Sequence, residues 1–179
     1  MSMVVDATLM EMDQEAVATR RLLERVPEDK LNWKPHPKSF SLGQIALHVA
    51  QVQGAVCAIA TQDVFQVPEF KQKEAETRTE ILETFERSLS TVRDLLTRLD
   101  DQRLMGTWTL EDHGEVLMTV PRVGLLRSLM LNHFYHHRGQ LVVYLRMLNV
   151  PIPSIYGPTA DENPFARRTA ATPSSHATA

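Results

Sequence analysis

Three of the seven histidines occur among apolar residues that recur at helical spacing. An imidazole at such a position is expected to face the protein interior, where it could bind a metal ion or take part in catalysis. His133 and His137 are four residues apart, so on a helix their side chains project from one face, about 5–6 Å apart. His48 lies between Ile45 and Val52 on another stripe of helical spacing. We therefore expect all three imidazoles to point into the protein interior, although spacing alone does not place the two helices against each other.

Three neutral imidazoles would suit one divalent metal ion. We expect zinc or nickel first and iron second, although imidazole by itself does not choose among them. A water in the open coordination position would have a lowered pKa and could act as nucleophile or base. The alternative is a structural polar cluster, because buried polar side chains are usually satisfied by hydrogen bonds alone. The spacing leaves both interpretations open.

The neighbours of the histidine pair are weaker candidates. His136 lies on a different helical face and is expected beside the site or on the surface. Arg138 and Gln140 could orient a ligand or substrate, although solvated helix residues have the same pattern. Cys57 has no cationic neighbour in the sequence that would activate a thiol, so we expect it to fill the core.

Four amphipathic helices are expected to position these side chains. Apolar residues recur at helical spacing within 5–26, 45–59, 81–99 and 126–148. Ser41 with Gln44, and Thr77 with Glu80, form N-terminal capping signatures, and Pro121 can open the last helix. The fold class is thus all-α, a four-helix bundle. Two short β-type runs at 107–110 and 116–119 indicate a hairpin between the third and fourth helices, and residues 63–76 read as a loop.

Composition excludes several classes of protein. The chain has 179 residues, 43% of them hydrophobic, and a net charge of −3, which argues against a nucleic-acid partner. A single cysteine excludes an internal disulfide and is consistent with a cytoplasmic protein. The uncharged stretch 39–62 is long enough to span a membrane, but its glutamines and His48 favour a buried helix instead. We expect one domain over residues 1–162 and a flexible tail over 163–179, which is rich in small and polar residues.

A longer run around the histidine pair resembles a known family. The segment 132–141, Asn-His-Phe-Tyr-His-His-Arg-Gly-Gln-Leu, looks like the signature of the DinB-like superfamily. The stretch from Trp33 to His48 is similar to the family's segment before its first histidine, and Tyr156 to Glu162 resembles its C-terminal segment. The similarity extends over roughly residues 5–162.

The resemblance implies a four-helix bundle with crossover connections, often a homodimer, and one divalent metal held by three histidines. These map to His48, His133 and His137. The family includes damage-inducible proteins and proteins assigned as metal-dependent hydrolases or thiol-dependent transferases, so the activity does not follow from the fold.

Two classes of function are therefore expected. The first is a metal-dependent enzyme that acts on a small molecule, either a hydrolase or a transferase of a low-molecular-weight thiol. A metal-bound thiol is deprotonated, which supplies the nucleophile at neutral pH. Asp161 and Glu162 are the candidate carboxylate bases. The second class is a non-catalytic metal- or small-molecule-binding stress protein.

Overall fold

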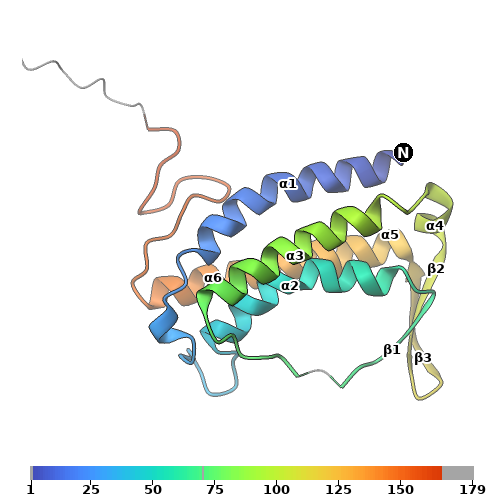
Figure 1. The fold of residues 1–179 in the computed structure, drawn as a ribbon, viewed down its shortest axis with the longest axis horizontal. Helices are drawn as coiled ribbons and strands as arrows, with labels where there is room; N and C mark the ends of the chain where they lie inside the picture. The colour runs from blue at the N-terminus through green and yellow to red at the C-terminus, as the bar shows by residue number, and fades with distance from the viewer. Residues whose placement is uncertain (1, 70, 167–179) are drawn as a thin grey trace, which may run out of the picture.

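The computed structural model describes residues 2–69 and 71–166. The chain is mostly helical, with a small three-stranded sheet at one end (Figure 1). Of the predicted tail at 163–179, residues 167–179 lie outside the described part, so its flexibility stays a prediction.

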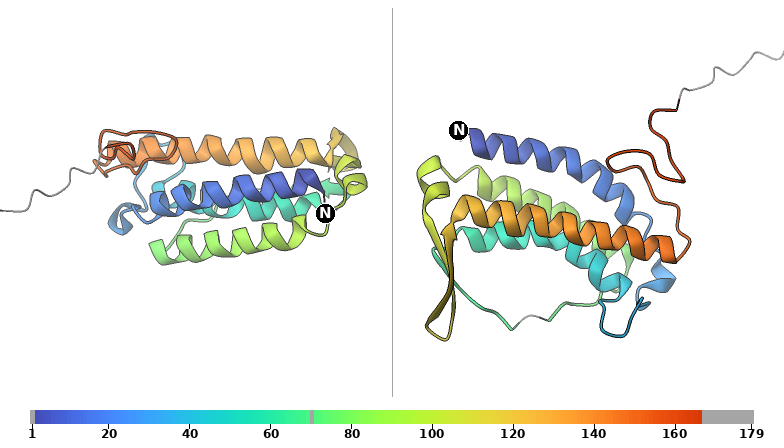
Figure 2. Two further views of the ribbon diagram at one scale, coloured as in Figure 1. Left: turned by 90° about the horizontal axis from the view of Figure 1, so that it is seen from above. Right: turned by 180° about the vertical axis from the view of Figure 1, so that it is seen from behind.

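Long helices run side by side through the molecule (Figure 2). α2 and α3 point in one direction, while α1 and the last helical stretch point in the other, so the α2–α3 connection must cross back along the molecule (Figure 1). The bounds of these helices are Met3–Leu23 for α1, Leu42–Ala60 for α2, Arg78–Leu96 for α3, and Arg122–Leu125, Leu126–Asn132 and His133–Met147 for the consecutive α5, η2 and α6.

The predicted helix starts are confirmed by their caps. The Ser41 hydroxyl accepts a hydrogen bond from the Gln44 N–H, and the Gln44 side chain accepts one from the Ser41 N–H, so the capping box is complete. Thr77 caps α3 by accepting from the Glu80 N–H. The Glu80 carboxylate reaches the N–H of Glu76 rather than that of Thr77, so this second cap is not reciprocal.

The predicted hairpin is also confirmed. Strands β2 (Thr107–Asp112) and β3 (Glu115–Pro121) pair antiparallel around a turn in which His113 and Gly114 have positive φ angles of 48° and 86°. The loop expected at 63–76 is wrong in one part, because β1 (Val64–Gln66) pairs parallel with β2. The short helices η1 (Glu28–Lys30) and α4 (Asp101–Met105) were not expected.

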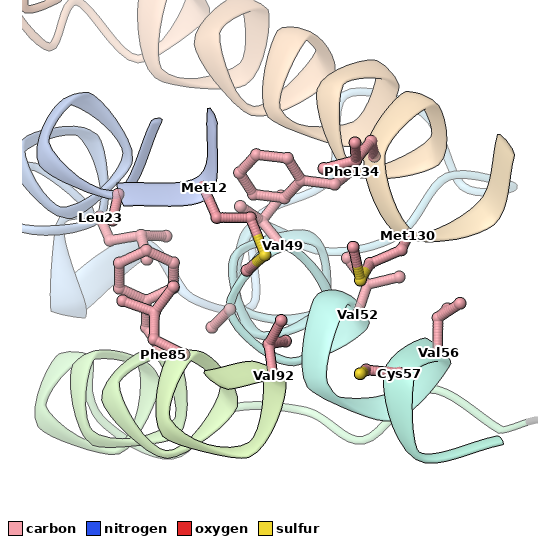
Figure 3. Close-up of a cluster of buried hydrophobic side chains, with 14 of the residues drawn as sticks. Met12, Leu23, Val49, Val52, Val56, Cys57, Phe85, Val92, Met130 and Phe134 are labelled. Carbon is pink, nitrogen blue, oxygen red and sulfur yellow. The ribbon is translucent and has the colours of Figure 1, made fainter. Parts of the chain in front are cut away.

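The core gathers around α2. Apolar side chains from α1, α3 and the last helical stretch converge on Val49 and Val52 of this helix (Figure 3). Gly54 allows α3 to approach closely, because a Cβ atom there would lie 2.9 Å from the Cα of Ser88. Among the described helices, α2 is long and apolar enough to cross a membrane, but 72% of its apolar window is buried inside the protein. Burial on this scale is what a core helix shows, as the sequence favoured.

Candidate metal centre

The structure brings the three predicted histidines together. His48 projects from α2, and His133 and His137 project from successive turns of α6. One ring nitrogen from each lies within 4.8 Å of the other two. His48 is 8% exposed and the other two are half-buried, so the cluster sits at the edge of the core.

Ring nitrogens, rather than ring carbons, face one another in this cluster. The Nε2 atoms of His48 and His133 are 3.0 Å apart. The ring of His137 lies 4.4 Å from each of the other two rings, measured between centroids. All three imidazoles therefore surround one small volume.

Two glutamines determine which nitrogen His48 and His137 present. The Nδ1–H of His48 donates to Oε1 of Gln72 at 3.0 Å, and the Nδ1–H of His137 donates to Oε1 of Gln140 at 2.8 Å. A neutral imidazole that donates from Nδ1 carries its lone pair on Nε2. Outer partners of this kind orient histidine ligands in metal sites and raise their basicity.

This donor set fits a divalent metal ion. Nitrogen–zinc distances of 2.0–2.1 Å in a tetrahedral site place ligand nitrogens about 3.3 Å apart. The 3.0 Å separation of the two Nε2 atoms is close to that value. The three ligand nitrogens lie within 4.8 Å of one another, and small rotations of the side chains would reduce the larger separations to about the same value. Three protein nitrogens also leave a coordination position for water or substrate.

Burial keeps the imidazoles neutral. Desolvation lowers the pKa of His48 and His133 below the ordinary histidine value, and it lowers the pKa of His137 to about 4. The proximity of the other imidazoles contributes to the lowered pKa of both His133 and His137. Since a metal ion binds only the neutral imidazole, all three side chains are ready to bind at neutral pH.

A π-helical segment leads into the site, where the sequence predicted one regular α-helix. In η2 the hydrogen bonds span five residues instead of four, and the N–H of His133 bonds to the carbonyl oxygen of Ser128. The Ser128 hydroxyl in turn donates to the carbonyl oxygen of Gly124 at 2.8 Å. π-Turns are rare and occur frequently at functional sites.

The surroundings of the cluster are apolar on one side. The Phe40 ring lies 6.1 Å from the His48 ring and 6.4 Å from the His137 ring. His136 is exposed, and its ring lies 5.0 Å from that of His137, so it stands beside the site as expected.

Arg138 lies elsewhere than the sequence suggested. It is 2% exposed and neither solvated nor directed at the histidines. Its guanidinium pairs with Glu15 of α1 at 2.6 Å and donates to the Thr19 hydroxyl at 2.8 Å. Gln140 does orient a candidate ligand, through its hydrogen bond to His137.

The two candidate bases are engaged in ion pairs away from the cluster. Asp161 pairs with Arg146, and Glu162 pairs with Arg21 at 2.5 Å. Cys57 fills the core as predicted, and burial raises the pKa of its thiol to about 12, which makes it unreactive.

Sequence reasoning missed Gln72, which lies in the connection between β1 and α3 and is 6% exposed. A signal was available in α2, where Gln44, His48 and Gln51 share one face of a largely apolar helix. Such a polar face on a buried helix requires a polar partner.

Comparison with known proteins finds relatives over most of the chain. The model of the DinB family matches residues 1–168. The uncharacterized protein YrdA of Bacillus subtilis (strain 168) is 26% identical over 163 residues, which cover 90% of this chain and 93% of YrdA.

Two solved structures share the fold. A DinB-like protein from Bacillus cereus ATCC 10987 superposes with a TM-score of 0.64 at 21% identity, over 83% of this chain and 95% of that chain. The DinB-like protein YjoA from Bacillus subtilis superposes with a TM-score of 0.61 at 18% identity, over 85% of this chain and 96% of that one. The chain belongs to the DinB family.

Proposed function

We propose that the protein binds one divalent metal ion through the Nε2 atoms of His48, His133 and His137 and is a metal-dependent enzyme acting on a small molecule. The observation that carries this proposal is the convergence of three neutral imidazoles within 4.8 Å, two of them held in the required tautomer by glutamines. Zinc or nickel is the expected ion, with iron as a further choice.

The bound ion would supply a Lewis acid that lowers the pKa of a coordinated water or thiol. The chain contributes three uncharged ligands, which leave the ion its full charge. Phe40 lies on one side of the site and makes that side apolar.

Two reactions fit this site: hydrolysis, and transfer of a low-molecular-weight thiol to an electrophile. We favour the transfer, because a thiol bound to the metal ion would release its proton to solvent. Its thiolate would then be the nucleophile without a protein base beside it. The two candidate bases, Asp161 and Glu162, are occupied by Arg146 and Arg21.

Metal analysis of the untagged protein tests the site. We expect close to one divalent ion per chain by inductively coupled plasma mass spectrometry, and none in the variant with all three histidines replaced by alanine. A screen of the metal-loaded protein with thiol cofactors and electrophiles, against hydrolysable esters and amides, then separates the two reactions.

The second candidate is a non-catalytic stress protein whose metal ion stabilises the fold. One observation favours it: the three ligands join α2 to α6, so a bound ion would cross-link two elements of the core. Metal-dependent thermal stability without turnover in either screen would support this alternative over the enzyme.

We further propose a homodimer in the cytoplasm, without nucleic acid or membrane as partner. Met3, Met10 and Val17 of α1 are 84%, 65% and 59% exposed, and their spacing of seven places them in one stripe. Exposed apolar side chains gathered in one stripe are typical of an interaction surface, so a second copy is the expected cover. The cytoplasmic assignment rests on the single cysteine, and the exclusion of nucleic acid rests on the net charge of −3.

A further inference from the structure

Gln72 connects a surface segment to the histidine cluster. Its Oε1 accepts from the Nδ1–H of His48 at 3.0 Å and from Nε2 of Gln51 at 3.3 Å. Its backbone carbonyl accepts from Nε2 of Gln44 at 3.2 Å. One residue of the β1–α3 connection thus bonds to three successive positions on one face of α2.

These contacts fix the orientation of the Gln72 amide. The Oε1 of Gln44 is occupied by the N–H of Ser41 at 3.0 Å, so its nitrogen is the end that faces Gln72. Gln51 also presents a donor to Gln72. Because Gln72 Nε2 donates to the carbonyl of Lys73 at 3.3 Å, its Oε1 faces His48, and the proton of His48 must be on Nδ1.

The segment 71–75 is anchored beyond Gln72. The Glu74 carboxylate accepts from the Ser41 hydroxyl at the N-terminus of α2, and Ala75 is 3% exposed. Gly43 makes this approach possible, because a Cβ atom there would lie 2.5 Å from Oε1 of Glu74. The anchoring of Glu74 and Ala75, together with its own bonds to α2, gives Gln72 its position.

We propose that Gln72 is a positioning residue for the metal centre, and that docking of the segment 71–75 on α2 and metal binding by the three histidines are thermodynamically coupled. Only the docked segment holds His48 with its Nε2 lone pair directed at the other imidazoles. Coupling of this kind is reciprocal, so bound metal must also stabilise the docked segment. The inference rests on the proposed metal site.

Zinc affinity, measured by competition with a chromophoric chelator, tests the role of Gln72. Loss of an outer partner to a histidine ligand typically weakens metal binding 10–100-fold, and we expect this range for Gln72→Leu. Gln72→Glu should restore affinity to near the wild-type value, because a carboxylate accepts the same Nδ1–H bond. The matched control is Gln66→Leu, since Gln66 is exposed at the end of β1 and its side chain bonds only to Glu111 among the described residues.

Two measurements report on positioning rather than on general stability. In the metal-free protein, ¹⁵N spectra should show His48 protonated on Nδ1 in wild type and a mixture of tautomers in Gln72→Leu. Hydrogen exchange at the amides of 71–75 should slow when zinc binds the wild type. In Gln72→Leu the same amides should exchange at rates that zinc does not change.

The outcomes separate this inference from the proposed site. A wild-type protein that binds no zinc would overturn both the site and the inference. Zinc binding by wild type with equal affinity in Gln72→Leu would overturn the inference alone, as would a Gln72→Glu variant as weak as Gln72→Leu. If Gln72→Leu does not fold, Glu74→Ala decides: it removes the carboxylate that binds the Ser41 hydroxyl and keeps Gln72 and the three histidines, and unchanged zinc affinity there would overturn the coupling.

Discussion

The Nε2 atoms of His48 and His133 lie 3.0 Å apart, although 85 residues separate them in the chain. The proton of His48 is used in the bond from Nδ1 to Gln72, so its Nε2 presents a lone pair to His133. In the metal-free protein the Nε2–H of His133 donates to this lone pair. A metal ion shared with His137 would replace this hydrogen bond and use all three imidazoles.

Removal of the ligands should remove the metal. We expect His133→Ala and His137→Ala to abolish stoichiometric metal and His48→Ala to weaken binding strongly. His36→Ala is the control, because His36 is exposed and its Nδ1 accepts only from Lys38 among the described residues. Native mass spectrometry makes the comparison. One metal ion per chain in the triple alanine variant would show that the ligands are assigned wrongly.

Chelation should lower thermal stability if the ion stabilises the fold. A ligand that binds only the native state raises the melting temperature. At pH 7.5 a chelator should therefore lower the melting temperature of the wild type and leave that of His133→Ala unchanged. Equal melting temperatures with and without the chelator, in protein shown to contain metal, would reject a stabilising ion while leaving catalysis open.

Acid should destabilise even the metal-free protein. Desolvation lowers the pKa of His137 to about 4 in the folded state, against about 6.5 for an unfolded chain. A lowered folded pKa means that this contribution to stability is complete above pH 6.5 and is lost as the pH falls toward 4. We expect the melting temperature to fall over this interval in calorimetry with chelator present. The triple alanine variant should show a smaller fall, and an equal fall would contradict the assignment.

Breaking the Arg138 ion pair should cost stability without affecting the metal. Arg138→Met leaves the Glu15 carboxylate without its buried cation, a change that typically costs about 3 kcal/mol. Arg87→Met is the control, because Arg87 forms an exposed pair with Glu83 that contributes less than about 0.5 kcal/mol. Urea unfolding measures both. We expect the folded variant to retain its metal, and loss of the metal would mean that Arg138 also supports the site.

The proposed dimer has a direct test. Light scattering at tens of micromolar should give about twice the chain mass of 20.3 kDa. Met10→Asp places a charge in the middle of the exposed α1 stripe and should yield a monomer, because a buried unpaired charge is costly. Asp94→Ala alters an exposed residue of another helix, α3, and should remain a dimer. A monomeric wild-type protein would contradict the proposed dimer.

Local signals in the sequence predicted much of the helical part. The capping residues Ser41 and Thr77 determine where their helices start through hydrogen bonds to residues three positions later. Both partners of each bond are therefore visible in one short stretch of sequence. The three histidines could be placed on inward faces because the helical period alone fixes those faces. The resemblance then supplied the expectation that the two helices meet.

Long-range pairing explains what the sequence did not predict. β1 is three residues long and is recognisable only through its parallel partner β2, more than forty residues away. Gln72 lies in a connection without periodicity, and its role follows from contacts with α2. Arg138 is buried because Glu15 of α1 faces it, and no spacing rule links residues 15 and 138.

The π-helical stretch before His133 has a consequence for how chains of this family differ in length. An extra residue in an α-helix normally rotates everything beyond it by about 100°. In η2 the wider turn absorbs a surplus residue, and the N–H of His133 reaches back five positions to Ser128. A chain one residue shorter between 126 and 132 could keep an ordinary α-helix and still present the same two histidines. In a sequence alignment of relatives we therefore expect single-residue gaps within 126–132, directly before the two histidines of α6.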